Sequence, residues 1–135
     1  DVALAVGADA VQRASTSLPV KDVRGLVGGR LKIGASVHSL PEAIEAEINS
    51  ADWVVFGPVY ETPSKRGFGP PQGLDKLSRV ATAVKIPVIA IGGITPERVR
   101  EVRRAGAQGV AVISAILTAD SPAAATRRFL EALAA

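Results

Sequence analysis

The chain of 135 residues has no cysteine and a single histidine, His38. The lack of cysteine excludes disulfides, iron–sulfur clusters, thiol nucleophiles and cysteine-built zinc sites. One imidazole also argues against a histidine-built metal site, so we expect no cofactor. No stretch reaches the ~18 apolar residues of a membrane span, and the start lacks the pattern of a signal peptide. These absences predict a cytoplasmic protein with no membrane partner.

Charge and composition narrow the class further. Hydrophobic residues make up 47% of the chain and charged residues 21%, which is typical of a globular domain and not of a disordered chain. Sixteen Lys and Arg stand against thirteen Asp and Glu, and the basic residues are scattered, so nucleic acid is not an expected partner. The length suits one domain, residues 1–135.

Short apolar runs alternate with longer amphipathic stretches, the pattern of βα units with a parallel sheet. The runs predict five strands, at Ala10–Arg13, Leu31–Ser39, Trp53–Tyr60, Pro87–Ile91 and Val110–Ile113. Helices are expected at Val2–Val6, at Leu40–Asn49 and at Pro122–Leu133. Two more are expected, one that follows the loop Glu61–Gly73 and ends at about Val84, and one that begins at Thr95. A closed (β/α)₈ barrel needs about 200 residues or more. We therefore expect an α/β fold that forms part of a TIM barrel, with outer helices and two open sheet edges.

The strand predicted at Leu31–Ser39 carries polar residues two positions apart. Residues with this spacing share one face of a strand, so Ser36 and His38 are expected on the inner face, close to the carboxyl end where barrel enzymes keep their active sites. Both are candidate catalytic residues. The alternative is that His38 is a structural histidine, hydrogen-bonded where a loop begins.

Three other strand ends carry candidate phosphate ligands. Thr62, Ser64 and Lys65 offer two hydroxyls and an ammonium within four residues. Gly92 and Gly93 follow the next strand, and glycine lets backbone N–H groups approach an anion closely. Ser114 follows the last strand. The alternatives are a solvated turn at 62–67 and an ordinary tight turn at the double glycine.

The motifs Ser36-Val-His-Ser, Gly57-Pro-Val-Tyr-Glu-Thr-Pro-Ser-Lys, Pro70-Pro-Gln-Gly-Leu and Ile91-Gly-Gly-Ile-Thr-Pro-Glu occur in this order along the chain. Together they resemble the thiamine phosphate synthase superfamily, and within it the TenI-type thiazole tautomerases. The resemblance implies a TIM barrel in which the five strands here are the fourth to the eighth. Gln12 and Arg13 depart from the pattern, because the family commonly has a histidine and an apolar residue there.

The resemblance also implies roles for individual residues. Ser36 and His38 would lie against a thiazole ring. The phosphate would contact two groups of residues: Thr62, Ser64 and Lys65, and the backbone at Gly92, Gly93, Ile113 and Ser114. Aromatising a thiazole carboxylate phosphate tautomer moves a proton between two carbons, and a single imidazole can perform both transfers.

Three hypotheses follow. The first is a thiazole tautomerase of thiamin biosynthesis whose partner is a phosphorylated thiazole. The second is a thiamine phosphate synthase-like transferase, which would need Mg²⁺ and ligands for pyrophosphate. The third is a non-catalytic barrel fragment that binds phosphate. We also expect a homo-oligomer, since exposed parallel edges associate readily.

Overall fold

The computed structural model describes residues 1–63, 67 and 69–135. Its strands are β1 (Ala10–Arg13), β2 (Lys32–Val37), β3 (Trp53–Phe56), β4 (Val88–Ile91) and β5 (Gly109–Ala111). Its helices are α1 (Val2–Ala5), α2 (Val20–Val27), α3 (Leu40–Ile48), α4 (Gly73–Ala83), the 3₁₀ turn η2 (Pro96–Arg98), α5 (Val99–Arg104), α6 (Ser114–Leu117) and α7 (Pro122–Ala134). The predicted five strands are therefore all present.

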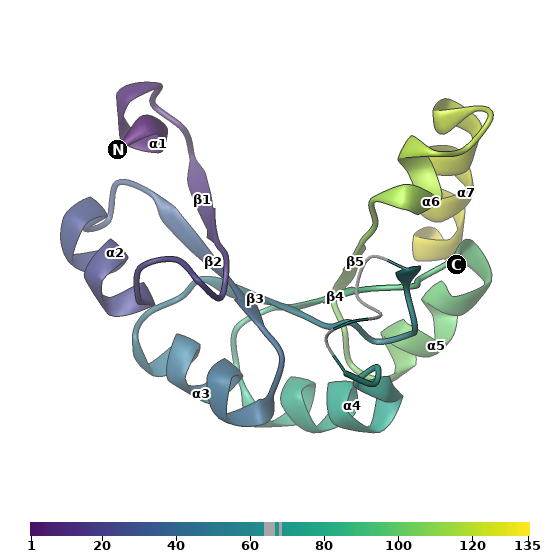
Figure 1. Cartoon of the computed structure of the whole chain (residues 1–135), viewed down its shortest axis with the longest axis horizontal. Helices are drawn as coiled ribbons and strands as arrows, with labels where there is room; N and C mark the ends of the chain where they lie inside the picture. The colour runs from purple at the N-terminus through teal and green to yellow at the C-terminus, as the bar shows by residue number, and fades with distance from the viewer. Residues whose placement is uncertain (64–66, 68) are drawn as a thin grey trace.

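The strands form one sheet in the order β1-β2-β3-β4-β5, and every neighbouring pair is parallel. The sheet is curved, and Figure 1 shows the helices ranged along its outer, convex side. Right-handed crossovers between consecutive parallel strands place the helices on one side in this way. The predicted part-barrel with outer helices is confirmed.

The core lies between the sheet and the outer helices. On β3 the side chains of Val54 and Phe56 are fully buried, whereas Trp53 and Val55, which alternate with them, are half-buried. Leu77 of α4 and Val102 of α5 complete the buried layer on the helical side. The period of two therefore gives β3 and β4 a helix-packed face and a concave face, and the concave face is where ligands reach a barrel sheet.

The structure adds a helix that was not predicted from the sequence. Helix α2 begins after Pro19 without a side-chain cap and contains Gly25, although Val20, Val23 and Val27 recur at helical spacing. The run at Trp53–Tyr60 gives a strand only to Phe56, although Val59 N–H still donates to the Ile91 carbonyl at 2.9 Å.

Within the described residues, no helix combines the length and apolarity needed to cross a membrane.

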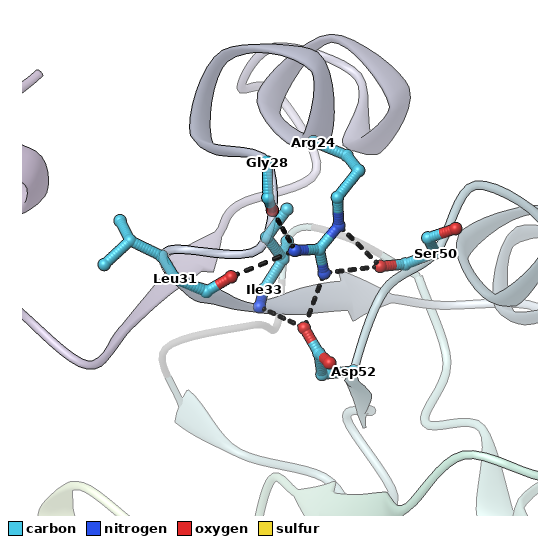
Figure 2. Close-up of polar contacts among 6 residues, drawn as sticks. All are labelled: Arg24, Gly28, Leu31, Ile33, Ser50 and Asp52. Carbon is cyan, nitrogen blue, oxygen red and sulfur yellow. Dashed lines mark hydrogen bonds and ion pairs between the residues drawn. The ribbon is translucent and has the colours of Figure 1, made fainter.

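An arginine cluster ties α2 to the amino-terminal edge of the sheet (Figure 2). The Arg24 guanidinium donates to the carbonyls of Gly28 at 2.8 Å, Leu31 at 3.0 Å and Ser50 at 2.7 Å, and to Asp52 Oδ2 at 2.6 Å. One planar fork thus holds two loop turns and the start of β3, a geometry that lysine cannot reproduce. In barrel folds this edge serves stability, whereas the opposite edge serves catalysis.

Arg24→Ala is expected to lower the free energy of unfolding by about 2–3 kcal/mol, because several carbonyls lose a charged donor at once. Arg24→Lys should recover only part of this loss. Chemical denaturation measures both, and Arg100→Ala on α5 is the matched surface control. Equal stability of Arg24→Ala and the wild type would show that the cluster contributes nothing.

The same cluster makes stability depend on pH. Burial raises the pKa of Asp52, but the hydrogen bonds from Ile33 N–H and Arg24 and the nearby positive charges outweigh it, so the net pKa is below its usual value. A carboxylate of this kind stabilises the fold above its unfolded pKa, and the contribution disappears as pH falls through the folded pKa. Unfolding measured from pH 7 down to pH 3 should therefore show a smaller acid-side loss for Asp52→Asn.

Candidate functional site

The carboxyl ends of the strands meet at one edge of the sheet because all the strands are parallel. His38 follows β2, residues 57–63 follow β3, Gly92 and Gly93 follow β4, and Ser114 follows β5 by three positions. Each predicted site residue that the structure describes, other than Ser36 within β2, thus lies just beyond a strand end. Ser64 and Lys65 lie outside the described residues.

Ser36 lies on the concave face and takes part in a row of hydrogen bonds across three strands. Strand register pairs Gly34 with Gln12 on one side and with Trp53 on the other. The Trp53 indole Nε1–H donates to Gln12 Oε1 at 3.1 Å, and Gln12 Nε2 donates to Ser36 Oγ at 3.1 Å. The sequence predicted the inward position of Ser36 but did not identify its partners.

Gly34 is the residue that allows this row to lie flat on the sheet. A Cβ atom at this position would lie 2.1 Å from Gln12 Oε1 and 2.2 Å from Trp53 Cε2. The pairing of Gln12, Gly34 and Trp53 across neighbouring strands was the signal that would have revealed the row. It requires strand register, which periodicity alone does not supply.

His38 lies at the rim, one residue beyond β2. Its backbone N–H donates to Glu42 Oε2 at 2.7 Å, and its ring Nδ1 lies 3.4 Å from the same oxygen. Ser39 caps α3, because its Oγ accepts from Glu42 N–H at 3.3 Å. With 39% of its side chain exposed, His38 is accessible and is oriented by a carboxylate. Ser36 and His38 therefore have different hydrogen-bond partners.

The double glycine has a packing role that the phosphate hypothesis did not include. Gly92 and Gly93 have φ of 101° and 64°, in the region that favours glycine. A Cβ on Gly92 would lie 2.6 Å from Pro58 Cα, and one on Gly93 would lie 2.6 Å from the Glu61 carbonyl oxygen. The two glycines thus let the segment after β3 lie directly against the end of β4.

Tyr60 anchors that segment from its other side. The Arg98 guanidinium lies 4.3 Å from the centre of the Tyr60 ring and donates to the Gly93 carbonyl at 2.7 Å. The Tyr60 hydroxyl donates a short hydrogen bond to the Glu101 carboxylate. Burial and the contact with Glu101 raise the pKa of Tyr60 to about 12, so the phenol is neutral at physiological pH.

A depression of about 260 Å³ adjoins this segment. Thr62, one of the predicted phosphate ligands, lines it together with Glu61, Tyr60, Pro58, Gly69, Pro70 and Pro71. On the neighbouring strand end, Ile113 is 66% exposed and Ser114 is the first residue of α6. Because Ala111 of β5 pairs with Ile91 of β4, Ile113 and Ser114 follow the strand beside the double glycine.

The described residues do not assemble a metal site. Among them, no three His, Asp or Glu side chains come together in a way that would hold a metal ion. Glu47, for example, accepts from the backbone N–H groups of Lys85 at 2.5 Å and Ile86 at 3.0 Å, which fixes the turn before β4. The Glu47 carboxylate therefore serves the fold.

The parallel sheet, the outer helices and the polar strand ends define this chain as part of a (β/α)₈ barrel. The family model described as thiamine monophosphate synthase matches residues 1–116. The chain belongs to this family, as its motifs indicated.

Curated relatives in the family are named as synthases. The chain is 46% identical to the thiamine-phosphate synthase of Salinispora arenicola and 44% identical to that of Chloroflexus aurantiacus, covering 98% and 95% of this chain respectively. A solved thiamine phosphate pyrophosphorylase from Pyrococcus furiosus is 41% identical over 99% of the chain, with a TM-score of 0.89. The chain spans 64%, 59% and 63% of these three proteins.

Proposed function

We propose that this chain provides the catalytic strand ends of a thiamine-phosphate synthase, a transferase that joins a phosphorylated thiazole to a second ring by displacing pyrophosphate. The observation that carries the proposal is the similarity over 99% of the chain to a solved thiamine phosphate pyrophosphorylase. The two curated relatives described above are thiamine-phosphate synthases, which favours this transferase over the TenI-type tautomerase.

The strand-end edge suits a phosphorylated ring. The backbone of Gly92 and Gly93 and the side chain of Thr62 belong to adjacent strand ends, where barrel folds frequently hold phosphate. Ser36, on the concave face, is placed to contact the ring itself. In this proposal Ser64, Lys65, Ile113 and Ser114 contribute to the same phosphate site, as the family resemblance implies.

The transferase hypothesis brings with it Mg²⁺, and the described residues do not fit a protein-built site for that ion. Mg²⁺ prefers carboxylate and other oxygen ligands, and the described part of the chain offers no cluster of three acidic or histidine side chains. The roles proposed here are therefore limited to binding and orienting the two organic substrates.

The tautomerase is the second candidate, and one observation favours it. The His38 imidazole is accessible at the rim and lies 3.4 Å from the Glu42 carboxylate, an arrangement that can hold a proton-carrying ring in place. The two reactions have different products, so a single sample distinguishes them.

Association between copies is also proposed. Exposed apolar side chains flank both edge strands, with Val2 and Val6 beside β1, and Ile113 and Leu117 beside β5. An oligomer would cover these side chains and pair the open edges. Sedimentation at micromolar concentration measures the mass of the assembly.

The test of the proposed function supplies the chain with thiazole phosphate, the pyrophosphate ester of thiamine's pyrimidine half, and Mg²⁺. We expect thiamine phosphate to form and pyrophosphate to be released in equal amounts. Chromatography detects the first product after oxidation to a fluorescent derivative. Ser36→Ala should slow its formation, and Ser78→Ala on the outer helix α4 is the matched control.

The other outcomes identify the alternatives. Aromatisation of the thiazole carboxylate phosphate tautomer without formation of thiamine phosphate would overturn the transferase in favour of the tautomerase. A folded chain that binds phosphate and catalyses neither reaction would favour the non-catalytic fragment.

A further inference from the structure

The hydrogen bonds across the concave face have a fixed direction. An indole Nε1–H donates and cannot accept, so the atom of Gln12 that Trp53 contacts must be the amide oxygen. The other end of the same amide is then the NH₂ group, which faces Ser36 Oγ and donates to it. The Trp53 indole, which can only donate, thereby fixes the orientation of the Gln12 amide and makes the Ser36 oxygen an acceptor of its NH₂ group.

The direction determines what the serine hydroxyl can offer a ligand. A hydroxyl has one hydrogen and can accept two hydrogen bonds. Because Gln12 Nε2 donates to Ser36 Oγ, the Ser36 hydrogen is not used in that contact. We propose that Trp53 and Gln12 are positioning residues that make Ser36 a hydrogen-bond donor toward a heteroaromatic ring nitrogen of the substrate bound on the concave face. The inference rests on the proposed function, because that function places the ring on this face.

Three features of the chain support the assignment. Gly34 carries no side chain at the one position where a Cβ would collide with both Gln12 and Trp53. Register places Gln12, Gly34 and Trp53 at one level on three adjacent strands, and Ser36 follows Gly34 by two positions on the same face of β2. Gln12 stands where the family resemblance gives a histidine, and its amide contacts both Trp53 and Ser36.

The first arm of the test examines the row in the free protein. Trp53 is the single tryptophan, so its indole N–H gives one resolved NMR signal. Gln12→Glu keeps an acceptor for the indole, whereas Gln12→Met removes it. We expect the indole signal and its exchange with solvent to be preserved in Gln12→Glu and to change in Gln12→Met. An unchanged signal in Gln12→Met overturns the inference.

The second arm measures binding of thiamine phosphate, whose pyrimidine nitrogens are acceptors, by Trp53 fluorescence. Ser36→Ala removes the donor, and Gln12→Glu redirects the serine hydrogen to the new carboxylate. Each should weaken binding by about five- to tenfold, the effect of one hydrogen bond. In the Ser36→Ala background, Gln12→Glu should have no further effect. Gln108→Glu, the same substitution at the other end of the sheet, is the matched control.

The non-additivity separates positioning from charge repulsion. A carboxylate that merely repelled the ligand's phosphate would weaken binding in the Ser36→Ala background as well, and it would also weaken binding of inorganic phosphate. Either result overturns the inference, as does a wild-type chain that fails to bind thiamine phosphate. A chain that binds thiamine phosphate and shows this pattern without forming product would overturn the proposed function alone.

Discussion

Gly92→Ala is expected to lower the free energy of unfolding by about 3–5 kcal/mol. This is the largest loss of stability that we predict, although the substitution adds a single carbon atom. Two costs combine at this position. The backbone has φ of 101°, where a side chain is strained, and the new Cβ would lie 2.6 Å from the Cα of Pro58. Backbone cannot rotate away as a side chain can, so the segment after β3 must move from the end of β4.

Gly73→Ala is the matched control for Gly92→Ala. Gly73 also has a positive φ, 78°, but a Cβ there would have no neighbour within 4 Å. The control should therefore show only the conformational strain, about 1–2 kcal/mol. Urea denaturation of both variants measures the difference. Equal losses in the two variants would mean that the contact with Pro58 is relieved at no cost.

Aromatisation of the thiazole carboxylate phosphate tautomer is expected to slow by ~10²–10⁴ in His38→Asn, if the chain performs that reaction, because general acid–base assistance has this magnitude. Asparagine keeps a polar group at the rim but cannot carry the proton between the two carbons. Formation of thiamine phosphate should change little, because bonding to a ring nitrogen with loss of pyrophosphate moves no ring proton. Measuring both reactions, aromatisation of the tautomer and formation of thiamine phosphate, in the wild type and in His38→Asn therefore distinguishes the tautomerase from the transferase.

Glu45→Gln serves as the control for His38→Asn. Glu45 lies on the same helix α3 but makes no hydrogen bond to His38. The His38 backbone N–H and ring Nδ1 both lie against the Glu42 carboxylate instead. A His38→Asn variant that aromatises the tautomer at the wild-type rate would exclude His38 as the proton carrier. Loss of thiamine phosphate formation in His38→Asn would instead give the imidazole a role in the transferase.

The sequence by itself determined the class of fold. Buried strands of a parallel sheet are continuous apolar runs, and those at Trp53–Tyr60 and Pro87–Ile91 stand out without knowledge of their neighbours. Alternation also placed Ser36 on the concave face, because side-chain direction along a strand is a local property. Helix α2 was missed because its start has no capping side chain and Gly25 interrupts it, although its valines recur at helical spacing.

The partners of the site residues were decided only by tertiary structure. Gln12 and Trp53 are 41 positions apart, and their contact depends on the register of three strands. The double glycine predicts a turn from the sequence alone, but its closeness to Pro58 follows from how the end of β3 folds against β4. Local pattern sets which residues can face a ligand, whereas strand register and loop packing set which groups they meet, because those depend on atoms far apart in the chain.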